Sequence, residues 1–113
     1  IHSEAYQAGE LKHGTISLIE DKTPVFAIIT DEEIKSKTLS NLAEVKARGA
    51  MTIVVSNEKI EGYDLCITVP KVNKFLQPLL VVPCLQLIAY EVARLRGCDI
   101  DKPKNLAKSV TVE

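Results

Sequence analysis

Aromatic side chains are scarce in this chain of 113 residues, which has no tryptophan and in which aromatics make up 4% of the residues. Proteins that hold single-stranded nucleic acid usually stack its bases on aromatic rings. The net charge is only −1, so the chain also lacks the basic excess that attracts nucleic acid or an anionic membrane. We therefore expect neither nucleic acid nor a membrane among its partners.

Cysteine is rare as well. The three cysteines, Cys66, Cys84 and Cys98, are odd in number and widely spaced, and no histidine cluster accompanies them. Disulfide frameworks and zinc sites need paired or closely spaced ligands, so neither is expected. Cys66 and Cys84 lie in apolar stretches and are interpreted as small core residues. We expect a cytoplasmic, reducing environment, no metal site and no bound cofactor.

Long hydrophobic runs and targeting signals are also missing. The longest apolar stretch, residues 79–89, is interrupted by Pro83 and Gln86 and is shorter than the roughly 20 residues of a membrane-spanning helix. No signal-peptide pattern is visible. The chain has 46% hydrophobic and 26% charged residues, which are ordinary globular values, and its length allows one small domain.

Two apolar runs rich in branched residues, 25–29 and 51–55, are typical of strands buried on both faces of a parallel sheet. The residues between them have a helical period, and Thr30 to Glu33 resembles a capping box at its start. Gly49 is placed to end this helix in the left-handed conformation. The pattern predicts a parallel β–α–β unit, and a third apolar run at 65–69 predicts another strand.

The remaining segments predict helices and a tail. Residues 3–8 have modest helix propensity, and residues 75–96 predict one helix, or two joined at Pro78 and Pro83. This second segment is apolar nearly all round and should be largely buried. The expected fold is therefore α/β, a partial doubly wound parallel sheet of three strands with flanking helices and an irregular C-terminal tail.

The tail contains an unusual lysine. Lys108 lies between small and apolar residues, in the segment 106–110, which indicates a tail that docks on the protein. A lysine held against apolar surface is dehydrated, which lowers its pKa, and a neutral amine can form a Schiff base with a carbonyl. The alternative is a solvated lysine on a C-terminal strand, and composition alone favours that alternative.

A histidine in a turn is the second candidate. Gly9 and Gly14 bracket residues 10–13, which predicts a compact turn or a single helical turn containing His13. An imidazole there can face a cleft and move a proton near neutral pH. The alternative is an exposed loop histidine, which is the simpler interpretation of the sequence alone. His2 is assigned no role.

Two motifs carry a resemblance to a known family. Asn105-Leu-Ala-Lys-Ser-Val-Thr-Val-Glu113 and Ser3-Glu-Ala-Tyr-Gln-Ala-Gly-Glu-Leu-Lys-His-Gly14 resemble the carboxy-terminal part of the isomerase region of glucosamine-6-phosphate synthases, the isomerizing glutamine–fructose-6-phosphate aminotransferases. Pro83-Cys-Leu-Gln-Leu-Ile-Ala-Tyr90 fits the same family. The resemblance runs over essentially the whole chain.

The resemblance implies a sugar-isomerase (SIS) domain. Residues 1–97 would be the C-terminal portion of the family's second SIS domain, and residues 98–113 its active-site tail. It implies an enzyme that makes glucosamine 6-phosphate from fructose 6-phosphate and glutamine-derived ammonia.

In the family Lys108 corresponds to the Schiff-base lysine, His13 to the residue that opens the sugar ring, and Ala107 to a residue lining the sugar pocket. It also implies a homodimer, with His13 serving the neighbouring subunit, and a glutaminase domain on the same full-length chain.

Two functional parts of the family's active site, a catalytic residue and a binding loop, are expected outside these residues. The general-base glutamate would lie just upstream of Ile1, and the phosphate-binding loop in the preceding module. The isolated chain is therefore predicted to be inactive. Thr15 stands where the family commonly has proline, which affects the turn geometry around His13. The alternative function is a phosphosugar-binding SIS module of a regulator, which catalyses nothing and has no use for the amine of Lys108.

Overall fold

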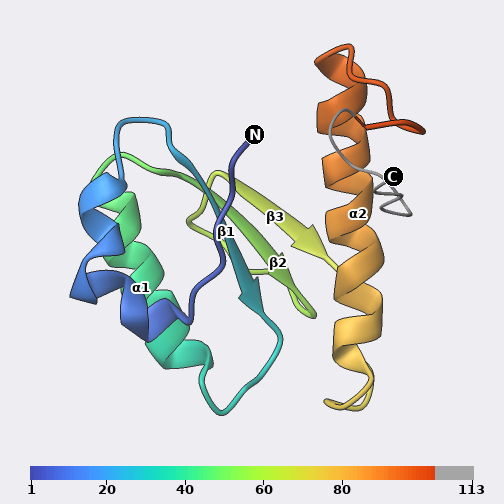
Figure 1. The fold of residues 1–113 in the computed structure, drawn as a ribbon. Helices are drawn as coiled ribbons and strands as arrows, with labels where there is room; N and C mark the ends of the chain where they lie inside the picture. The colour runs from blue at the N-terminus through green and yellow to red at the C-terminus, as the bar shows by residue number, and fades with distance from the viewer. Residues whose placement is uncertain (104–113) are drawn as a thin grey trace, which may run out of the picture. The chain divides into compact units, whose positions relative to one another are not determined.

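The computed structural model describes residues 1–103, which form two compact units, one from Ile1 to Val81 and one from Val82 onward. The three predicted strands are present, and the predicted α/β class is confirmed (Figure 1). In chain order the elements are the 3-10 helices η1 (Ala8–His13) and η2 (Thr15–Leu18), β1 (Pro24–Ile29), α1 (Lys35–Lys46), β2 (Met51–Ser56), β3 (Leu65–Thr68) and α2 (Gln77–Leu95).

The strands form one parallel sheet in the order β1-β2-β3. Val25 lies opposite Thr52, and Val54 lies opposite Cys66. Parallel pairing requires a crossover between consecutive strands, and α1 supplies it between β1 and β2. The carboxyl ends of all three strands therefore lie at one edge of the sheet.

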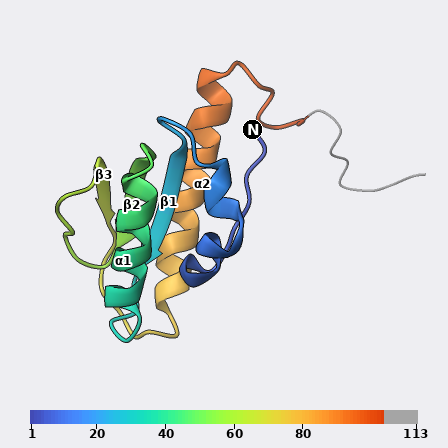
Figure 2. The same cartoon turned by 90° about the vertical axis from the view of Figure 1, so that its left-hand side faces the viewer.

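The core lies between the sheet and α1, which runs along one face of the strands (Figure 2). Ile29 from β1, Leu42 from α1 and Val54 from β2 form its buried centre. Side chains alternate between the two faces of a strand, so Val25 and Ala27 pack on the same side as Ile29. Thr52 to Ser56 of β2 are buried on both faces as predicted, whereas the other face of β1 is exposed in the described structure, with Phe26 and Ile28 at 42% and 49%, so burial of β1 on both faces was wrongly predicted.

The predicted capping box at the start of α1 is wrong. The helix begins at Lys35, its N-cap is Ile34, and no side chain caps it. Asp31 instead accepts a hydrogen bond from the backbone N–H of Glu33 at 2.9 Å. The acidic residues thus form a turn between β1 and α1, because a short polar side chain can bond to backbone two residues on.

Gly49 adopts a positive φ of 89°, as predicted for a residue that ends the helix. Its N–H donates to the carbonyl of Lys46 at 2.9 Å, and its own carbonyl accepts from the N–H of Lys22 at 2.7 Å. A Cβ at this position would lie 3.1 Å from Oδ1 of Asp21 and 3.3 Å from its Cα. Both the conformation and the close approach of the 20–23 turn require glycine here.

The helix predicted for residues 3–8 is wrong. No regular structure is present up to Gln7, and the chain then forms the 3-10 helix η1 from Ala8 to His13. Glycine destabilises a continuous α-helix, and Gly9 and Gly14 flank a segment long enough only for tight turns. The prediction of a compact turn around His13 is confirmed, and η1 packs beside α1 (Figure 1).

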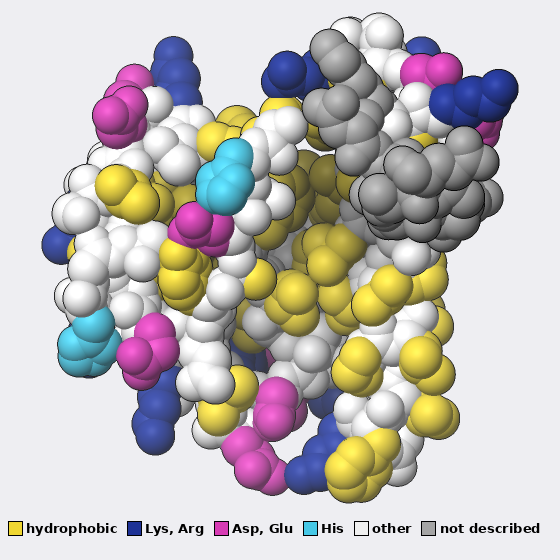
Figure 3. All heavy atoms as spheres, in the orientation of Figure 1, with side chains coloured by type: hydrophobic (Ala, Val, Ile, Leu, Met, Phe, Trp, Pro, Cys, Tyr) yellow, Lys and Arg dark blue, Asp and Glu magenta, His cyan; other side chains and the backbone are white. Residues whose placement is uncertain are grey.

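The segment predicted as one or two helices forms the single helix α2, with Pro83 in its interior. The expectation that it is largely buried is wrong for the structure described, because only Gln77 and Val81 of this helix are buried. Leu79 and Leu87 are 66% and 65% exposed. Figure 3 shows apolar side chains gathered on α2. Apolar surface of this kind marks an interaction site in many proteins.

The continuous apolar helix α2, Gln77–Leu95, is longer than the apolar stretch 79–89 expected from the sequence. The helix continues through Pro83 and Gln86, and by length and composition it is the one described helix that could cross a membrane. An apolar core helix of a water-soluble domain passes the same test, so this property is weak evidence. The expectation that no membrane is a partner remains a prediction.

Candidate functional site

His13 is the last residue of η1, and its side chain is exposed. The turn that follows is closed by two hydrogen bonds to backbone carbonyls. The N–H of Gly14 donates to Leu11 at 3.4 Å, and the hydroxyl of Ser17 donates to the carbonyl of Gly14 at 2.7 Å. The turn therefore presents the imidazole outward, where it can reach a second chain or a ligand.

The two predicted tail residues, Ala107 and Lys108, lie outside the described residues 1–103. Their proposed roles and their distance from His13 remain predictions. The predicted boundary between a domain ending at Gly97 and the tail 98–113 remains a prediction as well. Of the three predicted site residues, the structure thus places one, His13.

The carboxyl edge of the sheet is where ligands bind in open parallel α/β folds. Here the loops after β1, β2 and β3 surround a hollow of about 340 Å³. Asn57 and Val72 contribute to its lining. The other lining residues are mostly charged: Thr30, Asp31, Glu32, Glu33, Lys71 and Lys74.

Both lysines that line this hollow are paired with carboxylates that line it. Lys71 lies 3.2 Å from Glu32, and Lys74 lies 3.4 Å from Glu33. Lys35 is hydrogen-bonded to Glu58, which raises the pKa of Lys35 and lowers the pKa of Glu58. Because lysines and carboxylates offset each other, this edge has no surplus of positive charge among the described residues. The location of a phosphate loop remains a prediction.

A buried side-chain amide lies at the same carboxyl edge of the sheet. Gln77, at the start of α2, is only 2% exposed. Its Nε2 donates to the carbonyl of Pro70 at 2.9 Å, and its Oε1 accepts from the N–H of Val72 at 3.1 Å. Asn57 donates to the same Oε1 at 3.5 Å and to the carbonyl of Thr30 at 3.2 Å. We call these contacts the Gln77 amide network.

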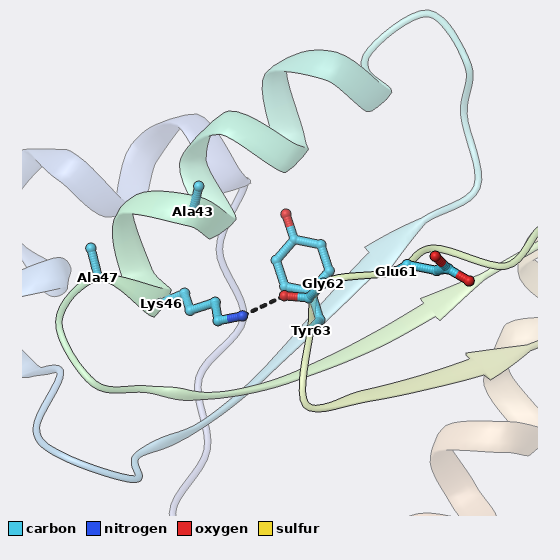
Figure 4. Close-up of a pocket in the computed structure, with 6 residues that line it drawn as sticks. All are labelled: Ala43, Lys46, Ala47, Glu61, Gly62 and Tyr63. Atoms are coloured by element: carbon cyan, nitrogen blue, oxygen red, sulfur yellow. Dashed lines mark hydrogen bonds between the residues drawn. The ribbon is translucent and has the colours of Figure 1, made fainter.

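A second hollow, of about 500 Å³, lies beside the end of α1 and the loop before β3 (Figure 4). Lys46 donates to the carbonyl of Gly62, and its Nζ lies 5.6 Å from the ring centroid of Tyr63. The wall formed by Ala43 and Ala47 is apolar. These groups form no nucleophile–base pair, so the contacts are those of a helix packed on a loop.

Sequence reasoning missed a polar contact at the amino-terminal edge of the sheet. Asp64, before β3, accepts from both the N–H and the hydroxyl of Thr52, at 2.7 and 2.6 Å. These bonds lower the pKa of Asp64. The two residues are twelve positions apart, and only the pairing of β2 with β3 brings them together. The contact stabilises the fold and lies away from the strand ends that bind ligands.

Metal ligands do not gather in the described part of the chain. Within residues 1–103, no group of three or more histidine, cysteine or acidic side chains could hold a metal ion. Cys66, Cys84 and Cys98 are free thiols. That the protein works without a metal or cofactor remains a prediction.

The described residues thus form an α/β unit with a three-stranded parallel sheet, an α1 crossover and an exposed histidine turn. The chain belongs to the SIS domain family, whose model matches residues 1–96. The fold and the predicted family are thus confirmed together.

Its relatives are aminotransferases. The chain is 53% identical over 113 residues to a glutamine–fructose-6-phosphate aminotransferase (isomerizing) of Bacillus subtilis (strain 168), and 53% identical over 117 residues to one of Clostridium acetobutylicum. Each alignment covers 100% of this chain and 19% of the relative. The chain therefore spans about a fifth of the length of these curated relatives.

A solved structure agrees with these relatives. The C-terminal domain of the glucosamine-fructose-6-phosphate aminotransferase from Francisella tularensis is similar to this chain with a TM-score of 0.83 and 36% sequence identity. The similarity covers 90% of this chain and 30% of that one. The sheet and helices described above therefore correspond to a part of that C-terminal domain.

Proposed function

We propose that this chain is the carboxy-terminal part of the isomerase region of a glutamine–fructose-6-phosphate aminotransferase. The parent enzyme would make glucosamine 6-phosphate from fructose 6-phosphate and ammonia released from glutamine. One observation carries the proposal: the alignment with a relative of 53% identity covers the whole chain, so it includes the segment that holds Lys108. A module that only bound a phosphosugar would have no need of the proposed amine chemistry at Lys108.

Lys108 is the proposed nucleophile. Its amine would condense with the C2 carbonyl of open-chain fructose 6-phosphate and release water. The resulting imine makes C2 electrophilic and the C1 protons acidic. Ammonia then displaces the lysine from C2, and transfer of a proton from C1 to C2 gives the aldose. Ala107 is proposed to line the sugar pocket beside it.

His13 is the proposed acid–base group for opening the sugar ring. Its exposed position at the end of η1 supports this role, because an imidazole at the surface can enter the site of a second subunit. We propose a homodimer in which His13 serves the partner's tail. The parent would also carry a glutaminase domain and act in the cytoplasm, where its free thiols would remain reduced.

The chain alone is proposed to be inactive. The lysines of the described carboxyl edge are paired with carboxylates, which supports a phosphate site in another part of the parent. A general base for the C1 proton is proposed to lie upstream as well. Sugar binding and catalysis are thus properties of the assembled parent, to which this chain contributes His13 and Lys108.

The test is to trap the imine. The full-length protein is incubated with fructose 6-phosphate and reduced with borohydride, and the modified peptide is located by mass spectrometry. We expect the sugar on Lys108, loss of the adduct in K108R, and its retention in K102R, which removes a lysine of the same tail. Binding of fructose 6-phosphate without any adduct at Lys108 would contradict the proposal and favour a phosphosugar-sensing SIS module instead.

A further inference from the structure

We propose that the hollow at the carboxyl edge of the sheet is an anion site that the protein's own glutamates keep closed. The ligand class that it would take is a small anion of the phosphate type, and its cations are Lys71 and Lys74. Glu32 and Glu33 stand in for that anion. The inference goes beyond the proposed function, and every residue that carries it lies in the unit from Ile1 to Val81.

The two lysines are carried by a backbone that the fold holds in place. On both sides of Lys71, at Pro70 and Val72, the backbone is hydrogen-bonded to one side-chain amide. That amide belongs to Gln77, which is only 2% exposed. The next turn, which carries Lys74, is closed by a backbone hydrogen bond of 2.8 Å. Cations on a fixed backbone bind an anion at a smaller entropic cost than cations on a loose loop.

The carboxylate of Glu32 lies where a bound anion would lie. Its Oε1 is 3.2 Å from Nζ of Lys71, and its Oε2 is 3.8 Å from Nζ of Lys35. One anionic group thus places an oxygen toward each of two ammonium groups, as a phosphate does when it binds lysines. Glu33 pairs with Lys74 in the same way, at 3.4 Å. Both lysines that line the hollow therefore already have an anionic partner from the turn after β1.

The charge of the lining decides whether an outside anion can enter. Three carboxylates and two lysines line the hollow, which gives a formal charge of −1. A phosphate group carries a charge of about −1.5 to −2 at neutral pH, so this lining repels it. The paired side chains are 55–77% exposed, and ion pairs this exposed contribute little to stability. Neutralising the two glutamates should therefore change the charge of the hollow and leave the chain folded.

The closed site has a consequence for specificity in the proposed parent. The carboxyl edge of a parallel α/β sheet is the usual place for a ligand, and a free pair of lysines there would compete for the sugar phosphate. Internal carboxylates at this edge would leave the sugar phosphate to the catalytic site. This consequence rests on the proposed function, whereas the closed anion site depends only on the described residues.

The experiment is a titration of the 113-residue chain with inorganic phosphate near neutral pH, with chloride keeping the ionic strength constant. The readout is the backbone amide NMR shifts of Thr30, Asn57 and Val72, which line the hollow. We expect the double variant Glu32→Gln/Glu33→Gln to bind phosphate at least about 10-fold more tightly than wild type, because the charge of the lining changes sign. The single variant E32Q should show a smaller gain in the same direction.

A matched control removes two carboxylates elsewhere. Glu20 and Glu44 are exposed and do not line the hollow, so E20Q/E44Q changes the net charge equally and should bind phosphate as wild type does. A second control tests the cations. Adding Lys71→Gln and Lys74→Gln to E32Q/E33Q should remove the gain, because only one carboxylate and no lysine then line the hollow.

Three outcomes overturn the inference. They are phosphate binding by wild type as tight as that by E32Q/E33Q, an equal gain in E20Q/E44Q, and a gain that survives the loss of both lysines. Should the double variant not fold, E32Q alone provides the test, and wild-type affinity in E32Q overturns the inference. None of these measurements involves Lys108, so a failure to trap the imine contradicts the proposed function and leaves this inference standing.

Discussion

The carboxylate of Asp64 accepts two hydrogen bonds from Thr52, one from the backbone N–H at 2.7 Å and one from the hydroxyl at 2.6 Å. Thr52 is fully buried in β2, and Asp64 directly precedes β3. The pair therefore joins the amino-terminal ends of two neighbouring strands. A buried N–H and hydroxyl would otherwise have to find other partners, so the pair links the charge of one side chain to the stability of the sheet.

The first prediction concerns acid stability. The hydrogen bonds from the side chain and backbone of Thr52 lower the pKa of Asp64 below its ordinary value. Its stabilising contribution is therefore complete above the unfolded pKa and is lost as the pH falls through the lowered folded pKa. We expect the amide of Thr52 to lose hydrogen-exchange protection over that acidic range. In D64N this pH dependence should be weaker.

Glu61→Gln is the control for that measurement. Glu61 lies in the same loop, and its side chain is 80% exposed. This substitution should leave the acid response of the Thr52 amide unchanged. Equal acid sensitivity of wild type and D64N would show that other carboxylates determine the acid response.

The second prediction separates backbone strain from steric contact. Gly49 and Gly62 have the same φ of 89°, but a Cβ added at Gly49 would meet atoms of Asp21 within 4 Å, whereas a Cβ added at Gly62 would meet none. Gly62→Ala should cost about 1–2 kcal/mol of unfolding free energy from the left-handed conformation alone. Gly49→Ala should cost more, because the 20–23 turn must also shift. Denaturant unfolding of the two variants measures the difference, and equal losses would contradict a role for Asp21.

The sheet can be predicted from sequence because its information is local. The apolar, β-branched composition of a run such as 51–55 can be seen in the sequence itself. The strand observed at Met51–Ser56 differs from the predicted strand by one residue. The left-handed conformation of Gly49 is predictable for the same reason, since glycine at the end of a helix has few alternatives. The fold class follows from these elements, and the family from the two motifs that contain His13 and Lys108.

The parts that cannot be predicted depend on distant residues. Residues 3–8 have helix propensity, but propensity contributes only tenths of a kcal/mol per residue and tertiary context overrides it. The burial of α2 depends on what covers it, and its composition cannot show this. Gln77 looks like an ordinary polar residue at the start of a helix, and only the folded chain shows that its amide is buried and hydrogen-bonded to the segment after β3.

The third prediction compares two leucines. Leu42 is 4% exposed and packs against Ile29 and Val54, so Leu42→Ala should cost about 2–5 kcal/mol of unfolding free energy. Leu79 on α2 is 66% exposed, and Leu79→Ala should change the stability of the chain itself by about 0.5 kcal/mol or less. Both values are measured by denaturant unfolding. A large loss for L79A would show that α2 is covered in solution.

The fourth prediction concerns the two histidines. In the full-length protein, His13→Asn should lower the rate of glucosamine 6-phosphate formation by about 100-fold or more, because general acid–base catalysis contributes about that factor. Glutamine hydrolysis should be largely unchanged. His2→Asn is the control, since His2 is exposed and its side chain is hydrogen-bonded to its near neighbour Glu4, at 2.9 Å. Unchanged synthesis in H13N would remove His13 from the mechanism.

The last prediction tests whether His13 and Lys108 of different subunits share a site. H13N and K108R are each expected to be inactive for synthesis. In a heterodimer of the two, one site would combine His13 from the K108R chain with Lys108 from the H13N chain and be intact, while the other would lack both residues. Random mixing should therefore restore about a quarter of the wild-type activity, since about half of the dimers are mixed and each has one working site. If both residues came from one chain, no site in the mixture would be intact and activity would stay at the level of the separate variants.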